Sequence, residues 1–115
     1  MRRPRYTIRH ANAVAPVACP CGVSRRILTA KDSRAASVHV VAIKADSQAH
    51  YHRRATEYYF VLSGRGSIEL DGQAVPVRAG HALCIPPGVR HRARGRLKIL
   101  NVVVPPFDPR DEFPA

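Results

Sequence analysis

Aromatic residues are scarce in this 115-residue sequence, which has no tryptophan, four tyrosines and three phenylalanines. Few side chains can stack on unpaired bases and no nucleic-acid-binding motif is present, so a nucleic-acid partner is not expected. No apolar run approaches the about 20 residues that a membrane-spanning helix needs. The basic N-terminus contains Arg2, Arg3, Arg5 and Arg9. Because residues 11–18 lack Leu, Ile and Phe, we expect no signal peptide, no membrane partner and a cytoplasmic location.

Cysteine is also scarce, and the three cysteines are an odd number, so we expect no disulfide framework. Cys19-Pro20-Cys21 lacks the second cysteine pair that a tetrahedral thiolate metal site needs. We interpret it as a turn with incidental thiols, the alternative being a redox or auxiliary metal role. Cys84 lies in the apolar run 82–85 and is expected to be a small core residue.

Acidic residues are few: eight stand against 19 basic residues, giving a net charge of +11. The densest basic stretch places arginines at alternate positions around His91, namely Arg90, Arg92, Arg94 and Arg96. On a strand this spacing puts the arginines on the face opposite His91. The charge predicts a solvated Arg-rich surface or, alternatively, attraction of an anionic ligand or partner.

A convincing helical period is missing, and only residues 30–36 resemble a short helix. Apolar runs cut by Gly, Pro and Asp predict strands at 26–30, 37–44, 57–62, 66–70, 73–77, 82–85, 91–94 and 97–104. Asp71-Gly72 predicts a type I′ hairpin turn. This pattern indicates an all-β sandwich or barrel. We expect an irregular arm or a loose first strand over 1–24, a single β-domain over 25–104, and a Pro-rich tail over 105–115 that straps the surface.

Histidines supply the chemistry. His50 and His52 share one face of an extended segment, and a hairpin would bring Glu57 back beside His52. His91 lies in a later strand, directly after the turn at 86–88, which would aim it inward. Three imidazoles and one carboxylate suit a first-row divalent metal with room left for water or substrate. The sequence therefore predicts a metal site at His50, His52, Glu57 and His91.

These residues resemble the two motifs of the cupin superfamily, specifically its small single-domain members. The first motif matches at His50, His52, Glu57 and Gly64, and the second at Gly80, Pro86, Gly88 and His91. Only 15 residues separate Gly64 from Gly80, as in small microbial cupins. Two turn positions depart from the pattern, with Lys44 and Gly95 where the family has Gly and Asn. The resemblance implies a double-stranded β-helix, a jelly-roll-like cupin barrel over 25–104, with the metal near one mouth, and a homodimer.

Other residues receive weaker interpretations. Tyr59 shares strand parity with Glu57 and is expected to be either a substrate contact or a barrel-lining aromatic. Tyr51 is expected to pack outside, His10 and His81 to lie at the surface, and His39 is assigned no role.

The resemblance implies a metalloenzyme acting on a small anionic substrate, such as a sugar acid, sugar phosphate or carboxylate, by isomerase, lyase or dioxygenase chemistry. The alternative is a non-catalytic cupin module that binds a metal or small ligand, because fold does not fix reaction. The Irving–Williams order favours zinc or nickel in an isolated sample, whereas iron or manganese is expected in a working enzyme.

Overall fold

The computed structural model describes residues 5–115, so Arg2 and Arg3 of the basic N-terminus lie outside the described residues. Nine strands account for the regular structure of this part: β1 (Val17–Cys19), β2 (Gly22–Leu28), β3 (Ser37–Ile43), β4 (His50–Tyr51), β5 (Thr56–Leu70), β6 (Gln73–Arg78), β7 (Ala82–Ile85), β8 (His91–Val104) and β9 (Phe113–Pro114). Two short 3-10 helices, η1 (Ala11–Ala13) and η2 (Pro109–Asp111), are added to them. The all-β class is therefore confirmed. Over residues 5–115 no helix has the length and apolar character needed to cross a membrane.

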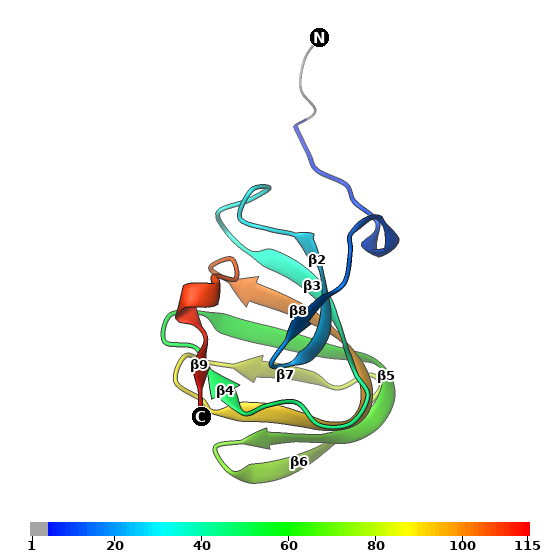
Figure 1. The fold of residues 1–115 in the computed structure, drawn as a ribbon, viewed down its shortest axis with the longest axis vertical. Helices are drawn as coiled ribbons and strands as arrows, with labels where there is room; N and C mark the ends of the chain where they lie inside the picture. The colour runs from blue at the N-terminus through cyan, green and yellow to red at the C-terminus, as the bar shows by residue number, and fades with distance from the viewer. Residues whose placement is uncertain (1–4) are drawn as a thin grey trace.

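The strands form one curled sheet, whose main path runs β1-β2-β3-β8-β4-β9. Strand β5 leaves this path and pairs with β6, β7 and β8. Because β5 and β8 are long and strongly curved, the sheet folds over itself and encloses an interior (Figure 1). This is the jelly-roll arrangement that the cupin resemblance implies.

Each of the two long strands was expected as a pair of shorter ones, 57–62 with 66–70 and 91–94 with 97–104. The structure corrects this, because β5 and β8 are each one strand and pair with each other along their length, with one register shift between Val61 and Ser63. Glycine makes the bend feasible: Gly64 has a φ of 89°, and a Cβ added to it would lie 2.1 Å from the carbonyl oxygen of Arg96. The glycines therefore bend the strands where we expected them to end.

Other expectations of local structure are confirmed. Asp71 and Gly72 both have positive φ, 50° and 85°, in the two-residue loop between β5 and β6. Residues 30–36, the one stretch that resembled a short helix, are an exception, because they form turns and bends. Strand alternation also holds in β8, where His91 is buried and Arg94 and Arg96 are exposed on the opposite face.

The segment over 1–24 contains β1 and the start of β2, so part of it is a first strand rather than an irregular arm. The tight β1–β2 turn brings Cys19 and Cys21 within 5.1 Å (Cα to Cα), and the structure joins them in a disulfide, contrary to our expectation of free thiols. Cys84 is also corrected: it is exposed, because alternation along β7 turns Ile85 to the core and Cys84 outward.

Candidate metal centre

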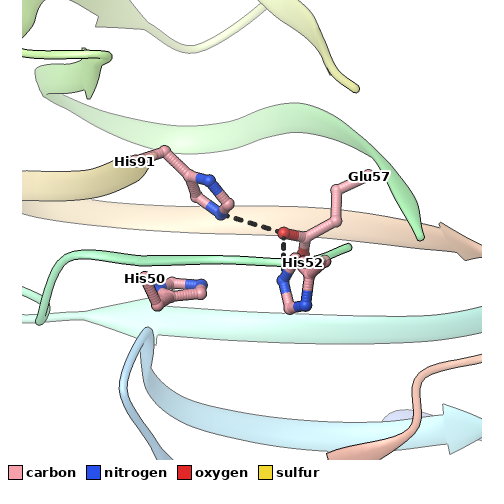
Figure 2. Close-up of side chains that lie close together, drawn as sticks. All are labelled: His50, His52, Glu57 and His91. Carbon is pink, nitrogen blue, oxygen red and sulfur yellow. Dashed lines mark hydrogen bonds and ion pairs between the residues drawn. The ribbon is translucent and has the colours of Figure 1, made fainter. Parts of the chain in front are cut away.

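Four buried side chains from separate parts of the chain meet inside the curled sheet (Figure 2). They are His50 on β4, His52 just after it, Glu57 on β5 and His91 on β8, and each is at most 4% exposed. One donor atom from each residue lies within 4.8 Å of the others. The structure thus brings together all four residues that the sequence singled out, in an arrangement that could hold a metal ion.

The expected hairpin between His52 and Glu57 does not form. Strand β4 pairs with β8, where His50 lies opposite His91, and with β9. The contact between His52 and Glu57 is made instead through a loop at 52–55 whose position is set by the C-terminal tail.

Asp111, a buried residue of the tail, holds this loop. Its carboxylate accepts hydrogen bonds from the backbone N–H groups of Arg53, Arg54 and Ala55, at 3.0 to 3.2 Å. A buried carboxylate needs such donors because burial removes its hydration. The sequence analysis missed Asp111, since nothing in the local pattern of the tail indicates a partner 56 to 58 residues away.

The ring orientation of each of the three histidines is fixed by a hydrogen bond to a backbone carbonyl. Nδ1 of His50 bonds the carbonyl of Gln48 at 2.9 Å, Nδ1 of His52 that of Asp111 at 2.8 Å, and Nδ1 of His91 that of Val89 at 2.9 Å. A carbonyl oxygen only accepts, so each Nδ1 must carry the proton. In the neutral rings, Nε2 therefore keeps its lone pair. This is how metal-ligating histidines are held in proteins.

Two of these lone pairs, on His52 and His91, face Glu57. Its Oε1 lies 2.8 Å from Nε2 of His52 and 2.9 Å from Nε2 of His91. Its Oε2 accepts a 2.6 Å hydrogen bond from Nδ2 of Asn101. Nitrogen lone pairs facing a carboxylate oxygen at this range repel unless a proton or a metal cation lies among them. Three imidazoles and a carboxylate are a donor set that a divalent transition metal accepts, so the residues fit such an ion.

For Glu57 and His52, burial and neighbouring charges shift the pKa in opposite directions. Burial alone would raise the pKa of Glu57, but the contacts with His52 and His91 outweigh it and hold that pKa well below its usual range. Burial would lower the pKa of His52, yet the Glu57 carboxylate raises it overall. Burial, together with the nearby His91, lowers the pKa of His50 to about 4. Glu57 is therefore a fixed negative charge at neutral pH.

A pocket of about 30 Å³ lies against the cluster. Residues that the sequence analysis did not assign to the site line it, including Arg26, His39, Asn101 and Glu112. His39 is 4% exposed, and its Nε2 lies 2.8 Å from Oγ of Ser37. The alternation Ser37-Val38-His39-Val40 in an apolar strand was the available signal, because polar residues there sit on the buried face.

The remaining interpretations have mixed outcomes. Tyr59 is buried, its ring centroid lies 6.2 Å from that of His91, and burial raises its pKa. Tyr51 stacks on Phe113 with ring centroids 5.4 Å apart. His10 and His81 are exposed, as expected.

A family model described as Cupin domain matches residues 37–103, more than half of the chain. Among curated proteins, the chain is 44% identical over 45 residues to Polyketide synthase CurC of Streptomyces cyaneus, covering 39% of this chain and 29% of that protein. It is 30% identical over 94 residues to L-ectoine synthase of Desulfatibacillum aliphaticivorans, covering 77% of this chain and 72% of that protein. The chain thus spans less than a third of CurC.

Solved structures give the same fold. A crystal structure of a protein from Planctomyces limnophilus superimposes with a TM-score of 0.87 and 40% identity, covering 93% of this chain and 95% of that one. The Streptomyces protein Pac13, described as a nucleoside dehydratase, superimposes with a TM-score of 0.82 and 23% identity, covering 99% and 92% of the two chains. At this identity the second comparison concerns the fold alone.

Proposed function

Because the chain belongs to the cupin family, we propose that it is a metalloenzyme that acts on a small anionic substrate beside one divalent metal ion held by His50, His52, Glu57 and His91. One observation carries the metal proposal: three histidines whose Nδ1 donates to a backbone carbonyl keep their Nε2 lone pairs, and two of these, on His52 and His91, face the Glu57 carboxylate.

We further propose a lyase or isomerase reaction. The similarity to L-ectoine synthase supports this class over dioxygenase chemistry. A bound metal would supply a Lewis acid that polarises a carbonyl or carboxylate oxygen of the substrate. His39, Tyr59 and Glu112 lie near the centre as groups that hold or exchange a proton, and burial raises the pKa of Glu112.

The anionic substrate is supported by the lining of the pocket. Arg26 faces it, and its guanidinium carbon lies 4.9 Å from the ring centroid of Phe107. A metal ion would add further positive charge. A sugar acid, sugar phosphate or small carboxylate would complement this lining.

Metal identity follows from availability as well as from ligands. We propose zinc or nickel in the isolated protein, because nitrogen-rich sites bind the later metals more tightly. We propose iron or manganese in the working enzyme, where metal availability also decides which ion is bound.

We also propose that the protein is a cytoplasmic homodimer. Exposed apolar side chains gather on the outer face of β5 and at the end of β8: Tyr58, Phe60, Leu62 and Val104. We call this set the outer apolar face. The exposed Cys84 on β7 lies opposite Tyr58 in the sheet and therefore borders this face. An apolar face of this kind is suited to burial against a second copy.

The test is elemental analysis of the purified protein and of His52→Ala. We expect about one equivalent of transition metal in the parent and little in the variant, because one of four ligands is lost. His81→Ala, which removes an exposed histidine, is the matched control and should keep the metal. Stoichiometric metal in His52→Ala would contradict the proposed site. Turnover of keto acids, hydroxy acids or sugar phosphates by the loaded protein then separates an enzyme from a binding module.

A further inference from the structure

One row of polar residues crosses the interior face of the sheet. Strand register aligns Arg26 on β2 with His39 on β3, His39 with Asn101 on β8, and Asn101 with Tyr59 on β5. We call Arg26, His39, Asn101 and Tyr59 the polar row. Three of them, Arg26, His39 and Asn101, line the pocket.

The rows on either side differ in character. On one side, Val41, Ile99 and Val61 align on neighbouring strands and belong to the hydrophobic core. On the other side, the row contains Glu57 of the metal centre. The polar row therefore lies between the core and the metal centre. His39, Asn101 and Tyr59 are buried and Arg26 is partly buried, and burying polar side chains costs free energy unless they have partners.

Asn101 has one buried atom without such a partner. Its Nδ2 donates to Oε2 of Glu57 at 2.6 Å, which identifies Oδ1 as the remaining acceptor. Oδ1 has no hydrogen-bond partner within residues 5–115, although Asn101 is only 8% exposed. An unpartnered buried acceptor beside a pocket calls for a donor, and a ligand hydroxyl would supply one.

Arg26, at the far end of the pocket-lining part of the row, forms no ion pair, although it lies close enough to Glu112 to offset part of the rise that burial causes in the pKa of that carboxyl. No carboxylate of the described chain lies within ion-pair range of its guanidinium, and Phe107 lies against it. Glu112 lines the same pocket but forms no ion pair with Arg26 there. A planar guanidinium backed by an aromatic ring is suited to bidentate binding of a carboxylate.

The geometry points to a small hydroxycarboxylate as the ligand of this pocket, with its carboxylate on Arg26 and its hydroxyl donating to Oδ1 of Asn101. This inference rests on the proposed function and specifies its substrate class. Strands β2 and β8 are separated by β3, so the two backbones lie about 10 Å apart, two strand spacings. A ligand that reaches both side chains therefore needs a short spacer between its carboxylate and its hydroxyl, and we take a linear chain of about four carbons as the probe.

The test compares three matched probes by calorimetry on the metal-loaded protein: 4-hydroxybutyrate, butyrate, which lacks the hydroxyl, and 1,4-butanediol, which lacks the carboxylate. We expect 4-hydroxybutyrate to bind at least about tenfold more tightly than either, because butyrate leaves Oδ1 of Asn101 without a donor and 1,4-butanediol leaves Arg26 without a carboxylate. Arg26→Gln should reduce the advantage over butanediol to within about twofold and keep the advantage over butyrate. Arg65→Gln, the same charge change at an exposed site, should keep both.

Two further measurements distinguish a failure of the proposed metal site from a failure of the hydroxycarboxylate inference. Metal content and thermal unfolding of Arg26→Gln should match the parent, and Arg26→Lys should retain part of the carboxylate advantage, because it keeps the charge but not the fork. A parent without metal would contradict the proposed function. A metal-loaded parent that binds the three probes equally, or an Arg26→Gln protein with unchanged preferences, would overturn the hydroxycarboxylate inference.

Discussion

The main-chain carbonyl of Asp111 accepts a 2.8 Å hydrogen bond from Nδ1 of His52, while the side chain of Asp111 holds the loop that begins at Arg53. One residue of the tail therefore sets both the ring orientation of a candidate ligand and the path of the chain after it. Outer partners of this kind are worth about 10–100-fold in metal affinity.

Replacing Asp111 with alanine should accordingly lower zinc affinity by about tenfold or more. Three buried or half-buried N–H groups would also lose their acceptor, so the free energy of unfolding should fall by about 2–4 kcal/mol. Competition against a chromophoric chelator and urea unfolding measure the two effects. Asp46→Ala, which removes an exposed carboxylate outside the tail, is the control. Equal zinc affinities in the two variants would refute a positioning role for Asp111.

His39 should make the protein less stable in mild acid. Burial, helped by the positive charge of Arg26, lowers its pKa to about 4, whereas the unfolded chain protonates near pH 6.5. Between these values the unfolded state binds the extra proton, so stability is lost as pH falls from about 6.5 towards 4. One such group contributes a slope of up to about 1.4 kcal/mol per pH unit.

In His39→Gln this part of the slope should disappear. Urea unfolding at several pH values from 7 to 4.5, with a chelator present, measures it, and His81→Gln serves as the exposed control. His50 also has a lowered pKa and contributes equally to every protein in the series. Identical slopes in the parent and His39→Gln would show that His39 binds its proton alike in both states.

If the outer apolar face forms the dimer interface, a charge placed on it should change the oligomeric state. Phe60→Glu places a charge among apolar side chains that a second copy would cover, so the dimer should dissociate to monomers. Analytical ultracentrifugation of the parent and the variant measures the masses. Val23→Glu, at an equally exposed apolar residue on β2, should leave the parent's mass unchanged. A parent that sediments as a monomer at all concentrations would be incompatible with the proposed homodimer.

Thiol reactivity provides a direct check of the cysteines. With Cys19 and Cys21 joined, only the exposed Cys84 should react with Ellman's reagent, giving about one equivalent in the untreated protein. Full reduction and unfolding should give about three equivalents. Three equivalents in the folded, untreated protein would mean that the pair is not oxidised.

Sequence patterns predicted the parts of the fold that depend on local order. Alternation and turn residues located β3, β6 and β7 closely, and Asp71-Gly72 gave its hairpin. The motif spacing predicted that His50, His52, Glu57 and His91 lie together, because these positions are fixed relative to the turns that orient them. Strand ends were less accurate, since glycine at position 64 is compatible with either a turn or a bend.

The surroundings of the site could not be predicted in the same way. Asp111 reaches the loop at 53–55 only after the tail has crossed the sheet, and Arg26 joins Asn101 only through the register of three strands. These contacts depend on how distant segments pack, which no local pattern encodes. Cys84 was assigned to the core because a short apolar run does not reveal which face of its strand is inward.

Strand β5 has consequences beyond the interior. Its residues alternate between the metal centre side, with Glu57 and Tyr59, and the outer apolar face, with Tyr58 and Phe60. A shift of this one strand therefore moves both surfaces at once. Self-association and occupancy of the interior are consequently two readouts of a shared element, and any energetic linkage between them must be reciprocal.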